Sequence, residues 1–190
     1  MEKVIKKLKE LTRHANVKIL NSGNAAIFAA AYIISRACTK KLVLVPDQGG
    51  WMSFSTYPLI FGLNVKEIKT DRGIIDLKDL EENAKGAGAL FVTSFAGYYA
   101  EQPMKEISKI CRKNSCLLVE DASGSIGDKI LCNGEYSDII VGSFGKWKAA
   151  DLGSGGFISS STKDYFENSR EIFSFMNFNG DYNAMLSKLE

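Results

Sequence analysis

Short apolar runs separated by polar turns recur along most of the chain. Each run is four or five residues long, and several consist almost entirely of valine, leucine and isoleucine. Such runs are typical of parallel strands that are buried on both faces. We predict strands at residues 17–20, 42–45, 65–68, 89–93, 116–119, 138–141 and 156–159.

Between most of these runs the apolar residues recur every three or four positions, which is the period of an amphipathic helix. Near the N-terminus, for example, Val4, Ile5, Leu8 and Leu11 share one helical face. Asp76 and Thr162 are predicted N-caps, and Pro103 suits a first helical turn. Asn24 is our expected cap for the most apolar helix. We predict helices at residues 2–14, 25–37, 50–61, 77–84, 104–113 and 162–175.

Strands that alternate with helices predict an α/β protein: a three-layer α/β/α sandwich with a mostly parallel, seven-stranded sheet. We divide the chain into an N-terminal helix at 1–16, a large domain at 17–175 and a C-terminal tail at 176–190. The tail is polar, and we expect a loop there followed by the start of another helix.

Composition narrows the classes of function. The chain has 190 residues, and a net charge of +2 gives no footprint for nucleic acid or a membrane surface. Its longest apolar stretch, 25–34, is shorter than the roughly 20 residues of a membrane span. The charged residues 1–10 do not look like a signal peptide, so we expect a cytoplasmic protein. Four cysteines without a CxxC pair and a single histidine predict no metal site.

Three chemically reactive groups follow two of the predicted strands. Asp121 closes one strand, Ser143 closes the next, and Lys148 lies on the loop after it. The carboxyl ends of parallel strands form the ligand-binding edge of such sheets, so these groups should meet. A buried carboxylate needs a cationic partner, and a lysine amine can bond to a cofactor aldehyde.

A second signal is the turn at Gly23 and Asn24, which opens a helix directly after a strand. The amides and the dipole of such a helix terminus can bind a phosphate group. Read singly, each feature has an ordinary alternative: a capped turn here, a loop cap at Asp121, and a solvated loop at Lys148. Lys146 competes with Lys148 for the amine role. Residues 123–127 offer a weaker phosphate loop for a nucleotide-binding protein.

Together these residues resemble fold-type I enzymes that depend on pyridoxal phosphate (PLP). Residues 138–156 match without a gap the pattern D-x-x-x-x-S-F-x-x-x-K-x-x-x-x-G-E-G-G, except that Ser154 replaces the glutamate. Residues 119–122 resemble the strand bearing the ring-nitrogen aspartate, and 22–26 resemble the phosphate turn. The match is closest to the DegT/DnrJ/EryC1/StrS sugar-aminotransferase family and spans about residues 17–190.

This resemblance implies a PLP-dependent transferase-like large domain, without the family's smaller C-terminal domain. Lys148 would form the Schiff base with PLP and carry the substrate proton, and Asp121 would pair with the ring nitrogen. Trp51 would stack on the ring, while Gly23, Asn24 and Ser143 would hold the phosphate. The implied reaction moves an amino group from a small-molecule donor to a keto acceptor, of which a sugar nucleotide is one candidate. Family members resemble one another in forming homodimers.

A non-catalytic protein of the same fold, acting as a binding or assembly module, is the alternative. Gly124 and Ile126 stand where the family usually has glutamine and histidine. We therefore expect that loop to lack the side chains that contact the cofactor ring in the family. Cofactor binding without amino-group exchange would distinguish this alternative from an aminotransferase.

Overall fold

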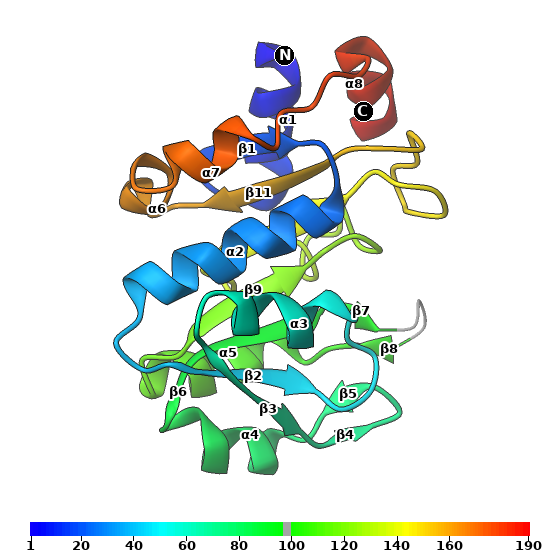
Figure 1. Cartoon of the computed structure of the whole chain (residues 1–190). Coiled ribbons are helices and arrows are strands. Elements are labelled where there is room, and N and C mark those ends of the chain that lie inside the picture. Colours follow the sequence, from blue (N-terminus) through cyan, green and yellow to red (C-terminus); the bar gives the residue numbers. More distant parts are fainter. Residues whose placement is uncertain (97–99) are drawn as a thin grey trace.

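A seven-stranded sheet forms the centre of the computed structural model, which describes residues 1–96 and 100–190 (Figure 1). The strand order is β1-β11-β10-β9-β6-β2-β3, and β11 alone runs antiparallel to its neighbours. The predicted fold class is confirmed. The strands of this sheet are β1 (Asn16–Leu20), β2 (Leu42–Pro46), β3 (Asn64–Ile68), β6 (Ala87–Thr93), β9 (Leu117–Asp121), β10 (Ile139–Ser143) and β11 (Gly156–Ser160).

Helices cover both faces of this sheet, which makes the three layers (Figure 1). On one face, α2, α3 and α7 pack on residues such as Val43, Val119 and Val141. On the other face, α4 and α5 cover Leu44 and Leu118. On the same face, α1 and α8 cover the side of the sheet formed by β1, β11 and β10. The helices are α1 (Glu2–Thr12), α2 (Gly23–Ala37), α3 (Ser53–Ile60), α4 (Leu77–Ala84), α5 (Met104–Lys113), α6 (Lys163–Glu167), α7 (Arg170–Ser174) and α8 (Tyr182–Leu189).

The central strands are mostly apolar and buried because both of their faces are covered, although β9 ends in the two acidic residues Glu120 and Asp121. The first six residues of β6 are buried, and four of the five residues of β9 are buried. The edge strand β3 buries only Ile68 fully, and its sequence is correspondingly polar. Two short hairpins lie outside the main sheet. They are β4 (Thr70–Asp71) with β5 (Ile74–Ile75), and β7 (Phe95–Ala96) with β8 (Ala100–Glu101).

Three local predictions are wrong. Ser22, not Asn24, caps α2, because its hydroxyl accepts a hydrogen bond from the Ala25 amide. α3 begins at Ser53 rather than at residue 50, which leaves Trp51 in the preceding loop. The single helix expected at 162–175 is two short helices, α6 and α7, and the Thr162 side chain makes no capping hydrogen bond.

The N-terminal helix and the helix of the predicted tail pack on each other. Val4 and Leu8 of α1 share a core cluster with Met185 and Leu189 of α8. All four side chains are buried. In the described part of the chain, no helix combines the length and apolar character that crossing a bilayer requires.

Candidate cofactor site

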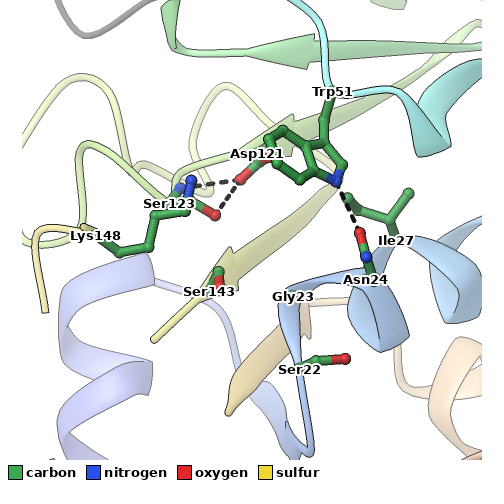
Figure 2. A pocket seen from close by; sticks show the side chains of 9 residues that line it. All are labelled: Ser22, Gly23, Asn24, Ile27, Trp51, Asp121, Ser123, Ser143 and Lys148. Atoms are coloured by element: carbon green, nitrogen blue, oxygen red, sulfur yellow. Dashed lines mark hydrogen bonds between the residues drawn. The ribbon is translucent and has the colours of Figure 1, made fainter. Parts of the chain in front are cut away.

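A pocket of about 130 Å³ lies at the carboxyl edge of the sheet, where β9 and β10 end beside the N-terminus of α2. Every residue that the sequence nominates for the site lines this pocket, and Figure 2 shows their side chains. The lining residues are Ser22, Gly23, Asn24, Ile27, Trp51, Asp121, Ser123, Ser143 and Lys148. A second pocket of about 250 Å³ shares Trp51, Asp121, Ser123 and Lys148 with the first.

The side of the pocket that we expect to bind phosphate is built by very close approaches of the start of α2 to the end of β10 and the start of β11. A Cβ atom placed on Gly23 would lie 2.6 Å from the Cβ atom of Ser143. A Cβ atom on Gly156 would likewise lie 2.5 Å from the carbonyl of Ser22. Glycine is therefore required at both positions. The approach places the α2 N-terminus, whose dipole favours anions, directly beside the Ser143 hydroxyl.

Asp121 is the last residue of β9, and its side chain is almost fully buried. Its Oδ1 accepts hydrogen bonds from the Ser123 amide at 3.0 Å and the Ser123 hydroxyl at 2.5 Å (Figure 2). Burial raises the pKa of Asp121, while Ser123 and the Lys148 charge act to lower it. A cationic group in the pocket would complete the stabilisation of this carboxylate.

Ser123 is a pocket residue that the sequence did not predict. Ser123 is the first residue of the loop after Ala122, and it bonds to the Asp121 carboxylate and lines both pockets. A signal was present in the sequence. A serine two positions after an aspartate can fold back on that carboxylate in a local turn.

Trp51 and Lys148 face each other across the pocket. The Lys148 Nζ lies 5.2 Å from the centroid of the Trp51 ring. The ring is held in place because Trp51 Nε1 donates to Asn24 Oδ1 at 2.8 Å (Figure 2). Asn24 therefore orients the aromatic ring, a contact that the sequence did not predict. Its backbone still lies in the first turn of α2, at the expected phosphate side.

The loop between β10 and β11 presents Lys148 rather than Lys146. Lys148 lines both pockets and is partly buried, whereas Lys146 is exposed and lines neither. The loop is pinned by Asp151, whose carboxylate accepts hydrogen bonds from the amides of Trp147 and Gly153. The Trp147 backbone is left-handed, with φ at 70°, so the chain turns sharply just before Lys148.

Residues 123–127 do not form the phosphate loop of a nucleotide-binding protein. They form turns, and the next helix along the chain is α6, beyond β10 and β11. Within this stretch Ser125 is buried, and its hydroxyl is bonded to the carbonyl of Leu131. The loop therefore offers no helix N-terminus to a nucleotide phosphate.

Comparison with known proteins gives a family match over nearly the whole chain. The profile of the DegT/DnrJ/EryC1/StrS aminotransferase family matches residues 2–181. UDP-4-amino-4,6-dideoxy-N-acetyl-beta-L-altrosamine transaminase of Campylobacter jejuni is 29% identical over 154 residues, which is 77% of this chain and 39% of that protein. The chain thus spans less than half the length of this curated relative.

Solved structures share the fold at low sequence identity. The Helicobacter pylori aminotransferase PseC, involved in pseudoaminic acid biosynthesis, has a TM-score of 0.79 and 16% identity, covering 98% of this chain and 54% of that one. 3-Amino-5-hydroxybenzoic acid synthase has a TM-score of 0.74 and 17% identity, covering 89% and 45%. Membership of this family indicates PLP as the cofactor. The pocket has the groups that PLP requires: an anion site, an aromatic ring, a carboxylate and an amine.

Proposed function

Because the chain belongs to the DegT/DnrJ/EryC1/StrS aminotransferase family, we propose that it binds PLP in this pocket and transfers an amino group between two small molecules. The observation that carries the proposal is the pairing of Lys148 and Asp121 in one pocket, 27 positions apart in sequence, with Trp51 beside both. A buried carboxylate and an amine at the two sides of an aromatic ring suit a flat, cationic heterocycle.

The phosphate group of the cofactor is assigned to Gly23, Asn24 and Ser143. The first two residues lie at the N-terminus of a fifteen-residue helix, and the third adds a hydroxyl. Backbone amides at such a terminus bind phosphate without needing a lysine or arginine. The proposed phosphate site therefore needs no basic residue, and on that side the lining residues are Ser22, Gly23, Asn24 and Ser143.

The ring is assigned to Trp51 and Asp121. Trp51, held by Asn24, would stack on the ring, and the Asp121 carboxylate would pair with the ring nitrogen. The bonds from Ser123 hold that carboxylate in position. When bound, PLP supplies an aldehyde that bonds to amines and a ring that withdraws electrons from the neighbouring carbon.

Lys148 has two tasks in this proposal. Its Nζ would hold the cofactor when no substrate is present, and once released it would take and return the proton on the substrate carbon. The Nζ position over the Trp51 ring leaves it close to a stacked cofactor. Because the Asp121 carboxylate would be paired with the ring nitrogen of the cofactor, Lys148 is the group that would act as the base.

The acceptor is assigned to the larger neighbouring pocket, which adds Gly49, Gly50, Thr93, Phe95 and Gly124 to the shared residues. A keto sugar nucleotide is the substrate class we propose, since the curated relative is named as a transaminase of a UDP-sugar. We also propose a homodimer as the working assembly, as the resemblance implies.

The test is to titrate the purified protein with PLP, reduce it with borohydride and map the modified peptide. We expect a visible absorbance band and a single adduct at Lys148. Lys148→Ala should abolish both, while the matched variant Lys146→Ala should keep both. No adduct, or an adduct at Lys146 alone, would overturn the assignment.

One observation favours the second candidate, a cofactor-binding protein without amino-group exchange. Gly124 lines the larger pocket where the family's loop usually supplies a side chain. A reduced adduct at Lys148 together with no exchange of the amino group from glutamate or other donors would support that function instead.

A further inference from the structure

A second carboxyl group is buried next to Asp121. Glu120 precedes it on β9, and its side chain is completely buried. Its Oε2 accepts a hydrogen bond of 2.5 Å from the Ser137 hydroxyl. Its Oε1 has no hydrogen-bond partner within the described ranges 1–96 and 100–190. A buried, half-partnered carboxyl group is costly in the charged form and much less so when neutral.

Ser137 connects Glu120 to the end of the first helix. Its carbonyl accepts a hydrogen bond of 3.0 Å from His14 Nε2. The Gly134 amide donates to the Thr12 carbonyl at 2.8 Å, and Arg13 pairs with Glu135 at 2.7 Å. Three successive residues at the end of α1 therefore bind residues 134–137, and within this stretch the Ser137 hydroxyl is bonded to Glu120.

The bonds of His14 define which of its nitrogens carries the proton. A carbonyl oxygen only accepts, so Nε2 must donate to Ser137. Nδ1 then accepts from the Ser159 hydroxyl at 2.9 Å. Burial lowers the pKa of His14 to about 4, so its ring is neutral at pH 7. His14 consequently brings no positive charge to the group around Glu120.

The remaining titratable neighbours of Glu120 bring no positive charge either. Asp121 on the same strand is acidic, and its charge raises the pKa of Glu120. The Cys132 thiol lies in the segment packed over it, and burial raises the pKa of that thiol, so it is neutral. Burial is the largest cause that raises the pKa of Glu120, to about 8, against the opposing effect of Ser137 and Ser94.

We propose that Glu120 is a neutral positioning residue. Its hydrogen bond to Ser137, which is itself bonded to His14, holds the segment 122–137 in place. Asp121 is then the one charged carboxyl group at this end of β9. The inference rests on the proposed role of Asp121 toward the cofactor. Ser123, which holds Asp121, lies at the start of the segment that Glu120 fixes. Ionisation of Glu120 would place a second, only partly compensated charge in the buried end of β9, which destabilises the packing of this segment on the sheet.

The first test compares wild type with Glu120→Gln, which imitates the neutral carboxyl group, by thermal unfolding without cofactor between pH 5 and 9.5. Between its ordinary pKa of 4.5 and about 8, Glu120 is ionised in the unfolded chain and neutral in the folded one. Wild type therefore loses stability as pH rises through this window, and the loss stays constant above it. We expect equal melting temperatures near pH 5 and Glu120→Gln about 5 °C or more above wild type at pH 9.

The second test measures PLP affinity of the same two proteins across this pH range. We expect Glu120→Gln to bind within about threefold of wild type at pH 7, and wild type to weaken at least tenfold more than the variant above pH 8. The exposed Glu106→Gln is the matched control and should follow wild type throughout. Ser137→Ala should weaken binding several-fold, and Ser137→Thr should restore it.

A constant ratio of the two affinities together with a constant difference in melting temperature across pH would overturn the inference. If Glu120→Gln fails to fold, an infrared carboxylic-acid band in wild type at pH 7 that disappears above pH 8 supports neutral Glu120. Absence of that band refutes it. If wild type binds no PLP, the proposed function fails, while the melting curves still decide the charge of Glu120.

Discussion

Single residues of the site are defined by contacts that admit few substitutes. Gly23 touches Ser143 so closely that a methyl group has no space, and Trp51 takes its orientation from one hydrogen bond to Asn24. Both contacts join segments that are far apart in the sequence. At this scale the residue types of the site were predictable, whereas the pairing of Asn24 with Trp51 was not, because it depends on tertiary distance.

Gly23→Ala tests the close approach of α2 and β10. The added methyl group would lie 2.6 Å from Ser143 Cβ, so the two backbones must separate. We expect a loss of about 1–3 kcal/mol in the free energy of unfolding and weaker PLP binding. Thermal melting and PLP titration measure the two effects. The control is Gly86→Ala, whose nearest contact is an ordinary 3.9 Å, and wild-type behaviour of both variants would contradict the geometry.

A double-mutant cycle tests the bond that orients Trp51. Trp51→Phe keeps an aromatic ring and loses the Nε1 donor, while Asn24→Ala loses the acceptor. Because each variant breaks the same contact, we expect similar losses of PLP affinity and little further loss in the double variant. Additive losses would mean that Asn24 acts on the cofactor independently of Trp51.

At the scale of elements, helix ends were predicted accurately where a capping residue or a proline marks the first turn. α4 and α5 begin and end at the predicted residues, because Asp76 caps the first and Pro103 precedes the second. The region 162–175 has no proline or glycine, so nothing local indicated a break. The break brings Phe166 and Phe173 to 5.6 Å between ring centroids, whereas seven residues of continuous helix span about 10 Å. Packing on α2 therefore outweighs helical continuity here.

His14, just after the end of α1, makes the folding stability of the protein depend on pH. His14 is neutral in the folded protein, since burial lowers its pKa from 6.5 to about 4. Below pH 6.5 the unfolded chain binds a proton that the folded chain refuses, so this contribution to stability is lost as pH falls toward 4. The maximum loss is about 3 kcal/mol.

Thermal unfolding of wild type and His14→Gln between pH 4 and 7.5 measures this loss. Gln retains a donor for the Ser137 carbonyl but does not titrate. The difference between the two proteins isolates the His14 contribution from that of Glu120. We expect the variant to gain on wild type progressively below pH 6.5, and a difference that does not vary with pH would contradict the neutral histidine.

For the whole molecule, the sheet explains why the site was predictable. Parallel strands place their carboxyl ends on one edge, so Asp121, Ser143 and the loop bearing Lys148 had to meet. The network behind the site was not predictable. It joins His14 to Ser137 and Ser159, at separations of 123 and 145 positions, through hydrogen bonds that leave no periodic trace in the sequence.

The pairing of β1 with β11 affects the order in which segments can fold while the protein is being synthesised. Asn16 pairs with Ser160, 144 positions later in the chain. At about 5–20 residues per second, a ribosome takes on the order of ten seconds to synthesise that interval. Throughout it the apolar stripe of α1 lacks its partners on the later strands and on α8. The α1 segment is therefore synthesised well before the strands and the helix on which it packs, and it is among the last to fold.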